Sequence, residues 1–257
     1  MGEAKRKKAA AAAAPVKERL PDAEANLIGM AIRQVIGATT SFHGADCVAY
    51  ALVGAEVLRR MGFDAKAVAG SAAWRVGPGD GDVLSHAIEM NHQSDGAFAP
   101  NHQSKAGMFH AWIECGLEVV DFTTYSFADK ARQLDAMDGN KTLVQWAPEF
   151  LWVGRKECSA LRAVANGFAV GVFAYIRNPD VERVVLTENP DFNAVGLADQ
   201  VFTVIELLRN GHQVRVIGLG DDGAQELGSA VADSVGKGLK RAEGPLLFGL
   251  GFKGMHK

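Results

Sequence analysis

The fold is decided by the stretch Phe109-His110-Ala111-Trp112-Ile113-Glu114-Cys115-Gly116-Leu117-Glu118-Val119-Val120-Asp121-Phe122. Its two halves are rich in β-branched and aromatic residues, and Cys115-Gly116 supplies the turn signal, so the stretch predicts a tight β-hairpin. If those two residues form the loop, His110 lies directly opposite Asp121. Opposed side chains on one face have Cβ atoms about 4.5–5.5 Å apart, close enough for the carboxylate to orient the imidazole. A longer loop would shift the partners, and a surface His–Asp pair would give the same pattern.

A cysteine stands at the predicted start of a helix upstream of this hairpin. Asp46 is a good N-cap residue, and the helix is expected to run from Cys47 to about Met61-Gly62. The unpaired amides and the dipole at a helix N-terminus favour thiolate over thiol. Cys47 shares a helical stripe with small and apolar residues, so we expect its thiol to face the hairpin.

The order of a helix cysteine, a strand histidine and a carboxylate on the next strand resembles the transglutaminase-like superfamily of the papain-like group. The likeness covers residues 40–125, is strongest at His110-Ala111-Trp112-Ile113-Glu114 and Val120-Asp121-Phe122-Thr123-Thr124, and extends to the arylamine N-acetyltransferases. It implies an α+β fold whose papain/transglutaminase-like core packs the nucleophile helix on an antiparallel sheet. It also implies that Cys47 is the nucleophile, His110 the general base and acid, and Asp121 the orienting carboxylate.

The chemistry implied by this resemblance is acyl transfer through a Cys-His-Asp triad on a peptide, a protein or a small amide or ester. The acceptor is left open between water and an amine, with hydrolysis modestly preferred because a polar loop would admit water. The sequence shows no Trp or Gln just before Cys47 for an oxyanion hole, which leaves the Cys47 amide as donor and His43 as a poorer second. The insert between Cys47 and His110 is long, and its sequence resembles no segment of a known family.

Two other classes of function stay open. One is a non-catalytic binding module on the same fold. The other is a metal-binding protein, because His86, His92, His102 and His110 fall within 25 residues. Their spacing lacks the close pairing of a preformed zinc site, so the expectation is no metal and no cofactor. His86 is also a rival base, although the carboxylate partner favours His110.

A glycine-rich motif near the C-terminus formally matches a dinucleotide fingerprint. It runs from Gly218 to Gly223, but Asp221 and Asp222 would place negative charge against a pyrophosphate. A strand-to-helix turn is the preferred interpretation.

Composition describes an ordinary globular protein. Hydrophobic residues make up 48% and charged residues 22% of the 257 positions, and the formal net charge of −3 gives no sign of a nucleic-acid partner. No run is long enough to predict a membrane span. The 3 cysteines are sparse and odd in number, which favours a reducing cytoplasm. Oligomeric state is left open.

The chain divides into three predicted parts. Residues 1–14 read as a disordered basic and alanine-rich tail, with a nuclear or nucleic-acid tag as the alternative; 15–156 form the transglutaminase-like core; and 157–257 form an appended mixed α/β region of unknown role. Hydrophobic periodicity predicts the remaining elements. They are helices around 27–36, 127–137 and 194–209, and strands around 64–75, 167–176 and 214–217.

Overall fold

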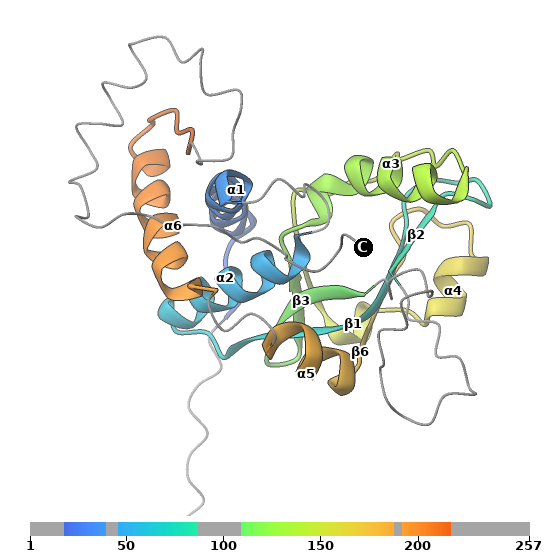
Figure 1. Ribbon diagram of the computed structural model, residues 1–257, viewed down its shortest axis with the longest axis horizontal. Coiled ribbons are helices and arrows are strands. Elements are labelled where there is room, and N and C mark those ends of the chain that lie inside the picture. Colours follow the sequence, from blue (N-terminus) through green and yellow to red (C-terminus); the bar gives the residue numbers. More distant parts are fainter. Residues whose placement is uncertain (1–17, 40–45, 87–108, 188–191, 217–257) are drawn as a thin grey trace, which may run out of the picture.

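The sheet at the centre of the molecule is antiparallel throughout (Figure 1). The computed structural model describes residues 18–39, 46–86, 109–187 and 192–216. Within them six strands pair in the order β2-β1-β3-β4-β5, and β6 also pairs with β1. Their bounds are β1 (Ala65–Arg75), β2 (Val83–His86), β3 (His110–Cys115), β4 (Glu118–Asp121), β5 (Leu151–Gly154) and β6 (Phe173–Arg177). The predicted α+β class is confirmed.

Helices cover both faces of this sheet. In Figure 1 α1, α2 and α6 gather beside one another and α3 lies apart from them; α1, α2, α5 and α6 share one hydrophobic cluster, and α3 belongs to the cluster on the opposite face. The bounds are α1 (Asp22–Thr39), α2 (Cys47–Arg60), α3 (Phe127–Asp138), α4 (Leu161–Asn166), α5 (Pro179–Thr187) and α6 (Ala194–Arg209), with 3-10 turns at Thr124–Ser126 and Arg155–Glu157. The helices around 27–36, 127–137 and 194–209 are therefore confirmed, whereas α4 and α5 were not predicted.

The two faces of β3 belong to two different hydrophobic clusters, because side chains alternate along a strand. Ala111 and Ile113 pack with the helices α1, α2, α5 and α6. Trp112 packs on the opposite face with Trp74 of β1 and Phe127 of α3. The residues of the hairpin thus contribute to both halves of the core.

The hairpin register differs from the prediction by one residue on each strand. Cys115 pairs with Glu118 and Ile113 with Val120, so the loop is Gly116-Leu117 rather than Cys115-Gly116. Gly116 has φ of 59°, and a two-residue turn with glycine first places that positive φ at the first loop position. The expectation that His110 directly faces Asp121 was therefore wrong. Because each strand is shifted by one residue, the side chains of His110 and Asp121 still lie on the same face of the hairpin, as diagonal neighbours.

Strands β2 and β3 lie end to end along one edge of β1. His86 pairs with Ala72 and His110 with Gly70, while β6 occupies the other edge. The ends of β2 and β3 therefore lie beside each other. The polar loop predicted between them, with His92 and His102, lies outside the described residues, as do residues 1–14, His43 and the motif Gly218–Gly223.

The region after residue 157 contributes directly to this sheet. Strand β6 pairs with β1 through residues that include Tyr175, and α6 contacts α1 and α2. The strand predicted around 214–217 is wrong over its described part, 214–216. Val214 and Val216 instead pack against the helical cluster, since an apolar residue can be buried without a partner strand.

Candidate active site

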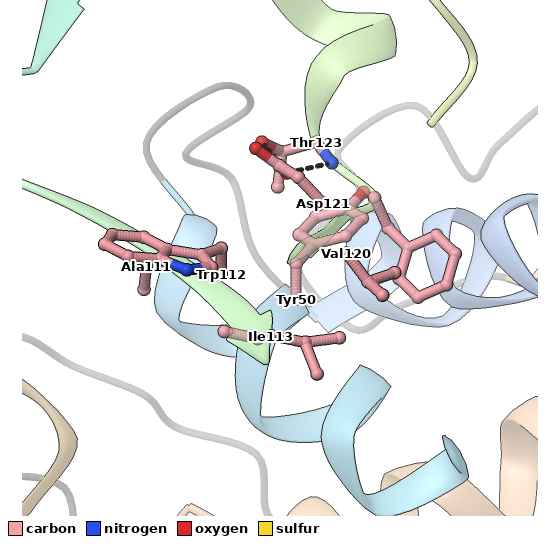
Figure 2. Close-up of a pocket in the computed structure, with 9 residues that line it drawn as sticks. Tyr50, Ala111, Trp112, Ile113, Val120, Asp121 and Thr123 are labelled. Carbon is pink, nitrogen blue, oxygen red and sulfur yellow. Dashed lines mark hydrogen bonds between the residues drawn. The ribbon is translucent and has the colours of Figure 1, made fainter. Parts of the chain in front are cut away.

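Asp121 is the centre of a buried hydrogen-bond network. Its Oδ1 accepts from the backbone N and the hydroxyl of Thr123, each at 2.8 Å (Figure 2). Its Oδ2 lies 2.8 Å from Nε2 of His110 and accepts from the Tyr175 hydroxyl at 2.8 Å. Tyr175 in turn accepts from Nε1 of Trp74 at 2.8 Å. The carboxylate is thus held by groups from β3, from β6 and from the turn that follows β4.

These contacts keep Asp121 ionised. Burial by itself raises the pKa of a carboxyl group, but the charge and hydrogen bond of His110, the Lys130 charge and the Thr123 amide lower the pKa of Asp121 below its usual value. An ionised carboxylate can only accept, so Nε2–H of His110 is the donor. In the neutral imidazole the lone pair then lies on Nδ1. No described residue hydrogen bonds that buried atom.

The imidazole of His110 is buried among aromatic rings. It stacks at 6.2 Å on Trp112, and its ring meets the Trp74 ring edge to face at 4.9 Å. Burial lowers the pKa of His110, the Asp121 charge opposes this effect, and the Lys130 charge adds to it, with a net lowering. His110 is therefore a neutral base at neutral pH.

Cys47 is the first residue of α2, as predicted, and is 5% exposed. Asp46 stands at the N-cap position, although its side chain makes no capping hydrogen bond. Burial raises the pKa of the Cys47 thiol to about 11, against the Lys130 charge and a backbone hydrogen bond from Ala111 that lower it. The prediction of a favoured thiolate was therefore wrong, because desolvation at this helix start outweighs the amides and the dipole.

The thiol and the imidazole approach β3 from different sides. Cys47 belongs to the helical cluster with Ala111, whereas the rings around His110 belong to the other. Since Nδ1 of His110 has no hydrogen-bond partner among the described residues, the thiol does not hydrogen bond it. The structure therefore forms the His–Asp half of the predicted triad and leaves the Cys–His contact unmade.

Two members of this network were not anticipated from the sequence. Lys130 of α3 is 1% exposed and donates from Nζ to the Thr123 hydroxyl at 2.7 Å. A lysine in a short polar helix gives no signal of burial, since most such residues are solvated. Tyr175 lies on a predicted strand, but nothing in the sequence indicates that this strand joins the same sheet.

His86, the rival base, is the last residue of β2. Its ring lies 5.8 Å from that of His110, and burial lowers the pKa of His86 well below its usual value. Oδ2 of Asp121 accepts the hydrogen bond from Nε2 of His110, so His110 is the histidine that has the carboxylate partner. Among described residues no group of His, Cys, Asp or Glu side chains is arranged to hold a metal ion.

The space around these residues is narrow. Tyr50 and Ala51 of α2, with Ala111 and Ile113 of β3 and Asp121 of β4, line a cleft that has no room for a water molecule (Figure 2). Figure 2 shows Tyr50 and Ile113 between the helix and the hairpin. This cleft reaches Asp121 but is lined by neither Cys47 nor His110, so the described residues form no open substrate cavity between the thiol and the imidazole.

Comparisons with known proteins place no activity on this site. Residues 21–148 match the model of a family described as a protein of unknown function (DUF2026). No curated protein matches the chain. A crystal structure of the genomics target APC5867 superposes with a TM-score of 0.46 and 16% identity, over 76% of this chain and 80% of that chain. In the described residues no helix has both the length and the apolarity needed to cross a membrane.

Proposed function

We propose that this chain is a cysteine-dependent acyl-transfer enzyme of the transglutaminase-like kind. Cys47 is the nucleophile, His110 the general base and acid, and Asp121 the orienting carboxylate. One observation carries the proposal: His110 is bound through Nε2 to an ionised Asp121, while its buried Nδ1 has no hydrogen-bond partner in the described part of the chain. A neutral imidazole fixed in this tautomer is the form that accepts a proton in nucleophilic catalysis.

The proposed reaction begins with transfer of the Cys47 thiol proton to Nδ1 of His110. Sulfur then forms a bond to the carbonyl carbon of an amide or ester, and the oxyanion accepts a hydrogen bond from the backbone amide of Cys47. The tetrahedral species collapses by breaking the bond to the leaving group, which takes the proton from His110. Water or an amine then gives a proton to His110, attacks the thioester carbonyl and releases the Cys47 thiol.

The charge states support proton transfer during the reaction rather than before it. The pKa of Cys47 is raised to about 11 and that of His110 is lowered, so both groups are neutral at neutral pH. Asp121 then stabilises the imidazolium as it forms, because its carboxylate already accepts the hydrogen bond from Nε2–H of His110. The sparse cysteines agree with a site of action in the reducing cytoplasm.

A non-catalytic binding module on the same fold is the second candidate. It is favoured by the high thiol pKa and by the lack of a hydrogen bond from the thiol to Nδ1 of His110. The two candidates differ in whether His110 changes the reactivity of Cys47.

The experiment is alkylation of the full chain by iodoacetamide between pH 6 and 10, followed at each cysteine by mass spectrometry. Cys115 is the internal control, because it is 8% exposed, its pKa is raised to about 12, and no histidine of the described residues contributes to that shift. We expect Cys47 to react faster than Cys115 at pH 7, and His110→Ala to slow it by about tenfold or more. Near-ultraviolet circular dichroism verifies that the variant is folded.

The same experiment can also overturn the enzyme proposal. If Cys47 and Cys115 react alike and His110→Ala changes neither rate, the binding module is the correct reading. If the Cys–His pair is confirmed, peptide and ester substrates are assayed with water or a primary amine as acceptor, which decides between hydrolysis and transfer.

A further inference from the structure

His86 and His110 lie next to each other on one face of the sheet. Their partners on β1, Ala72 and Gly70, are two residues apart, so both imidazoles project from the same side. The two ring centres are 5.8 Å apart, and the Trp74 ring meets His86 at 5.7 Å and His110 at 4.9 Å, edge to face in both cases. Packing against one tryptophan therefore holds the two imidazoles in a fixed relation to each other.

Both imidazoles have the same tautomer in their neutral form. Nε2 of His110 donates to the carboxylate of Asp121. Burial lowers the pKa of His86, whereas a hydrogen bond with the backbone of Phe109 raises it, which is the effect of a carbonyl that accepts from the ring. Because Nδ1 of His86 has no partner in the described part of the chain, Nε2 is the nitrogen that makes this bond. Each ring thus carries its lone pair on Nδ1.

The two Nδ1 atoms are buried acceptors. Neither is hydrogen bonded by a residue that the structure describes, and they do not bond to each other, since neither carries a proton in this tautomer. Buried acceptors are normally satisfied by a donor, and a bound water commonly supplies it. A molecule with two donor hydrogens can serve both rings. Its position is distinct from the cleft beside Asp121, which neither histidine lines.

The surroundings of the two rings favour a small, neutral donor. Both Nδ1 atoms are buried, and the rings of Trp74 and Trp112 lie against His110. Primary amines are cations at neutral pH. A cation is disfavoured here because the ammonium of Lys130 already lies 5.1 Å from the centre of the Trp74 ring. Water is small and neutral and has two donor hydrogens.

We propose that His86 and His110 together bind the water that attacks the thioester, so that the enzyme is a hydrolase. This inference rests on the proposed function and names its acyl acceptor. It assigns to His86 a role that the predicted triad does not contain, as a second hydrogen-bond acceptor beside the base.

The proposed step begins with one water that donates a hydrogen bond to each Nδ1. One O–H bond breaks and its proton passes to His110, while the oxygen forms a bond to the thioester carbonyl carbon. His86 keeps the hydrogen bond from the second O–H and so orients the oxygen. The bond from carbon to sulfur then breaks, and His110 returns the proton to Cys47. The products are a carboxylic acid and the free thiol.

The test separates acylation from deacylation in the full chain with p-nitrophenyl acetate. The burst of p-nitrophenol reports acetylation of Cys47, and the steady rate that follows reports attack by water. His86→Phe keeps an aromatic ring against Trp74 without the acceptor. We expect this change to alter the burst rate by less than about twofold and to lower the steady rate by about tenfold or more.

Two further variants control this experiment. His86→Asn places an amide oxygen near the position of Nδ1, so it should recover part of the steady rate that His86→Phe loses. His212→Phe replaces an exposed histidine and should match the wild type in both phases. Near-ultraviolet circular dichroism verifies that each variant is folded.

Nuclear magnetic resonance detects the water without any substitution. The Hε1 proton is next to Nδ1 in the imidazole ring, so we expect a nuclear Overhauser effect from a long-lived water to Hε1 of both His86 and His110. In His86→Phe the effect at His110 should weaken. The wild-type measurement applies whether or not p-nitrophenyl acetate acylates Cys47, and even if His86→Phe does not fold.

The outcomes separate this inference from the proposed function. If His86→Phe releases the acetyl group at the wild-type rate while His110→Ala abolishes the burst, the role of His86 is overturned and the enzyme proposal stands. The absence of a water signal at both rings also overturns it, as does a product that is mainly the amide when glycine ethyl ester is present. If His110→Ala changes neither the burst nor the alkylation of Cys47, the proposed function itself has failed.

Discussion

His110 donates from Nε2 to Oδ2 of Asp121 at 2.8 Å although the two residues are not opposite each other in the hairpin. Continuing the observed register places Asp121 opposite Trp112, one pair further along. Diagonal neighbours on one face are separated by about 7–8 Å at Cα, which an imidazole and a carboxylate can bridge. Side-chain length thus compensates for the offset, and the pair forms in either register.

Removing the charge of Asp121 is expected to be costly. Asp121→Asn leaves Lys130 buried without its nearby anion and places an amide where His110 and Tyr175 donate. We expect a loss of about 3–5 kcal/mol in the free energy of unfolding, measured with urea at pH 7. Asp180→Asn, which breaks an exposed pair with Arg183 at 3.1 Å, is the control and should change it by less than about 1 kcal/mol.

The difference in unfolding free energy between the wild type and Asp121→Asn should depend on pH with a defined sign. The folded pKa of Asp121 is below its unfolded value of 3.8, so its stabilisation is present above that pH and is lost as the pH falls further. The difference in unfolding free energy between the wild type and Asp121→Asn should therefore become smaller as the pH falls. A constant gap, or a loss below about 1 kcal/mol at pH 7, contradicts the prediction.

Local pattern was sufficient for much of this site. Alternation and a glycine predicted the hairpin, and Asp46 as an N-cap residue placed Cys47 at the start of α2. The register was missed because a glycine can occupy either position of a two-residue turn. The thiol pKa was missed because the sequence reports the helix terminus and not the burial that opposes it. Neither the turn position of the glycine nor the burial of the thiol can be read from the local sequence pattern.

Tyr175 illustrates a contact that only the tertiary structure reveals. It comes from β6, 54 residues after Asp121, and its hydroxyl donates to Oδ2 while accepting from Trp74. A strand in an antiparallel sheet can pair at any free edge, so its sequence does not name its neighbour. The region expected as an appendage therefore completes the network around the candidate base.

Tyr175→Phe tests that contribution. The ring is kept, but Nε1 of Trp74 loses its acceptor and Asp121 loses a donor. We expect a loss of about 1–3 kcal/mol in the free energy of unfolding, together with a rise in the pKa of Asp121 measured by carbon-13 resonance. A variant with wild-type stability and an unchanged Asp121 titration would show that the hydroxyl contact is dispensable.

The thiol of Cys47 makes stability sensitive to alkali. Its pKa is raised from 9.0 to about 11, so the folded state retains the proton more tightly than the unfolded state. Its stabilising effect is complete below pH 9.0 and disappears as the pH rises through the folded pKa of about 11. Relative to Cys47→Ala, the wild type should lose about 2–3 kcal/mol of unfolding free energy across this window.

Urea unfolding at pH 8, 9, 10 and 11 measures how the free energy of unfolding changes with pH. Cys158→Ala is the control, because Cys158 is only partly buried and should contribute less. Equal slopes for the wild type and Cys47→Ala would mean that the thiol is not desolvated.

Gly70 of β1 allows the backbone of β6 to approach closely beside the strand that carries His110. It pairs with His110 on one side and Arg177 on the other. A Cβ at this position would lie 2.2 Å from the backbone O of Ile176 and 2.7 Å from the backbone N of Asn178, which cannot rotate away. Gly70→Ala should therefore separate β6 from β1 and draw Tyr175 from Asp121, at a cost of about 2–3 kcal/mol in thermal or urea unfolding.

Gly54→Ala is the matched substitution for this last prediction. A Cβ there would lie 2.6 Å from Cδ1 of Ile113, the movable end of a side chain, and alanine favours the helix by about 1 kcal/mol over glycine. The net change for Gly54→Ala should stay within about 1 kcal/mol. If Gly70→Ala is as mild as Gly54→Ala, or leaves the Tyr175 contact intact by the Asp121 titration, β6 is not held against β1 as closely as the structure indicates.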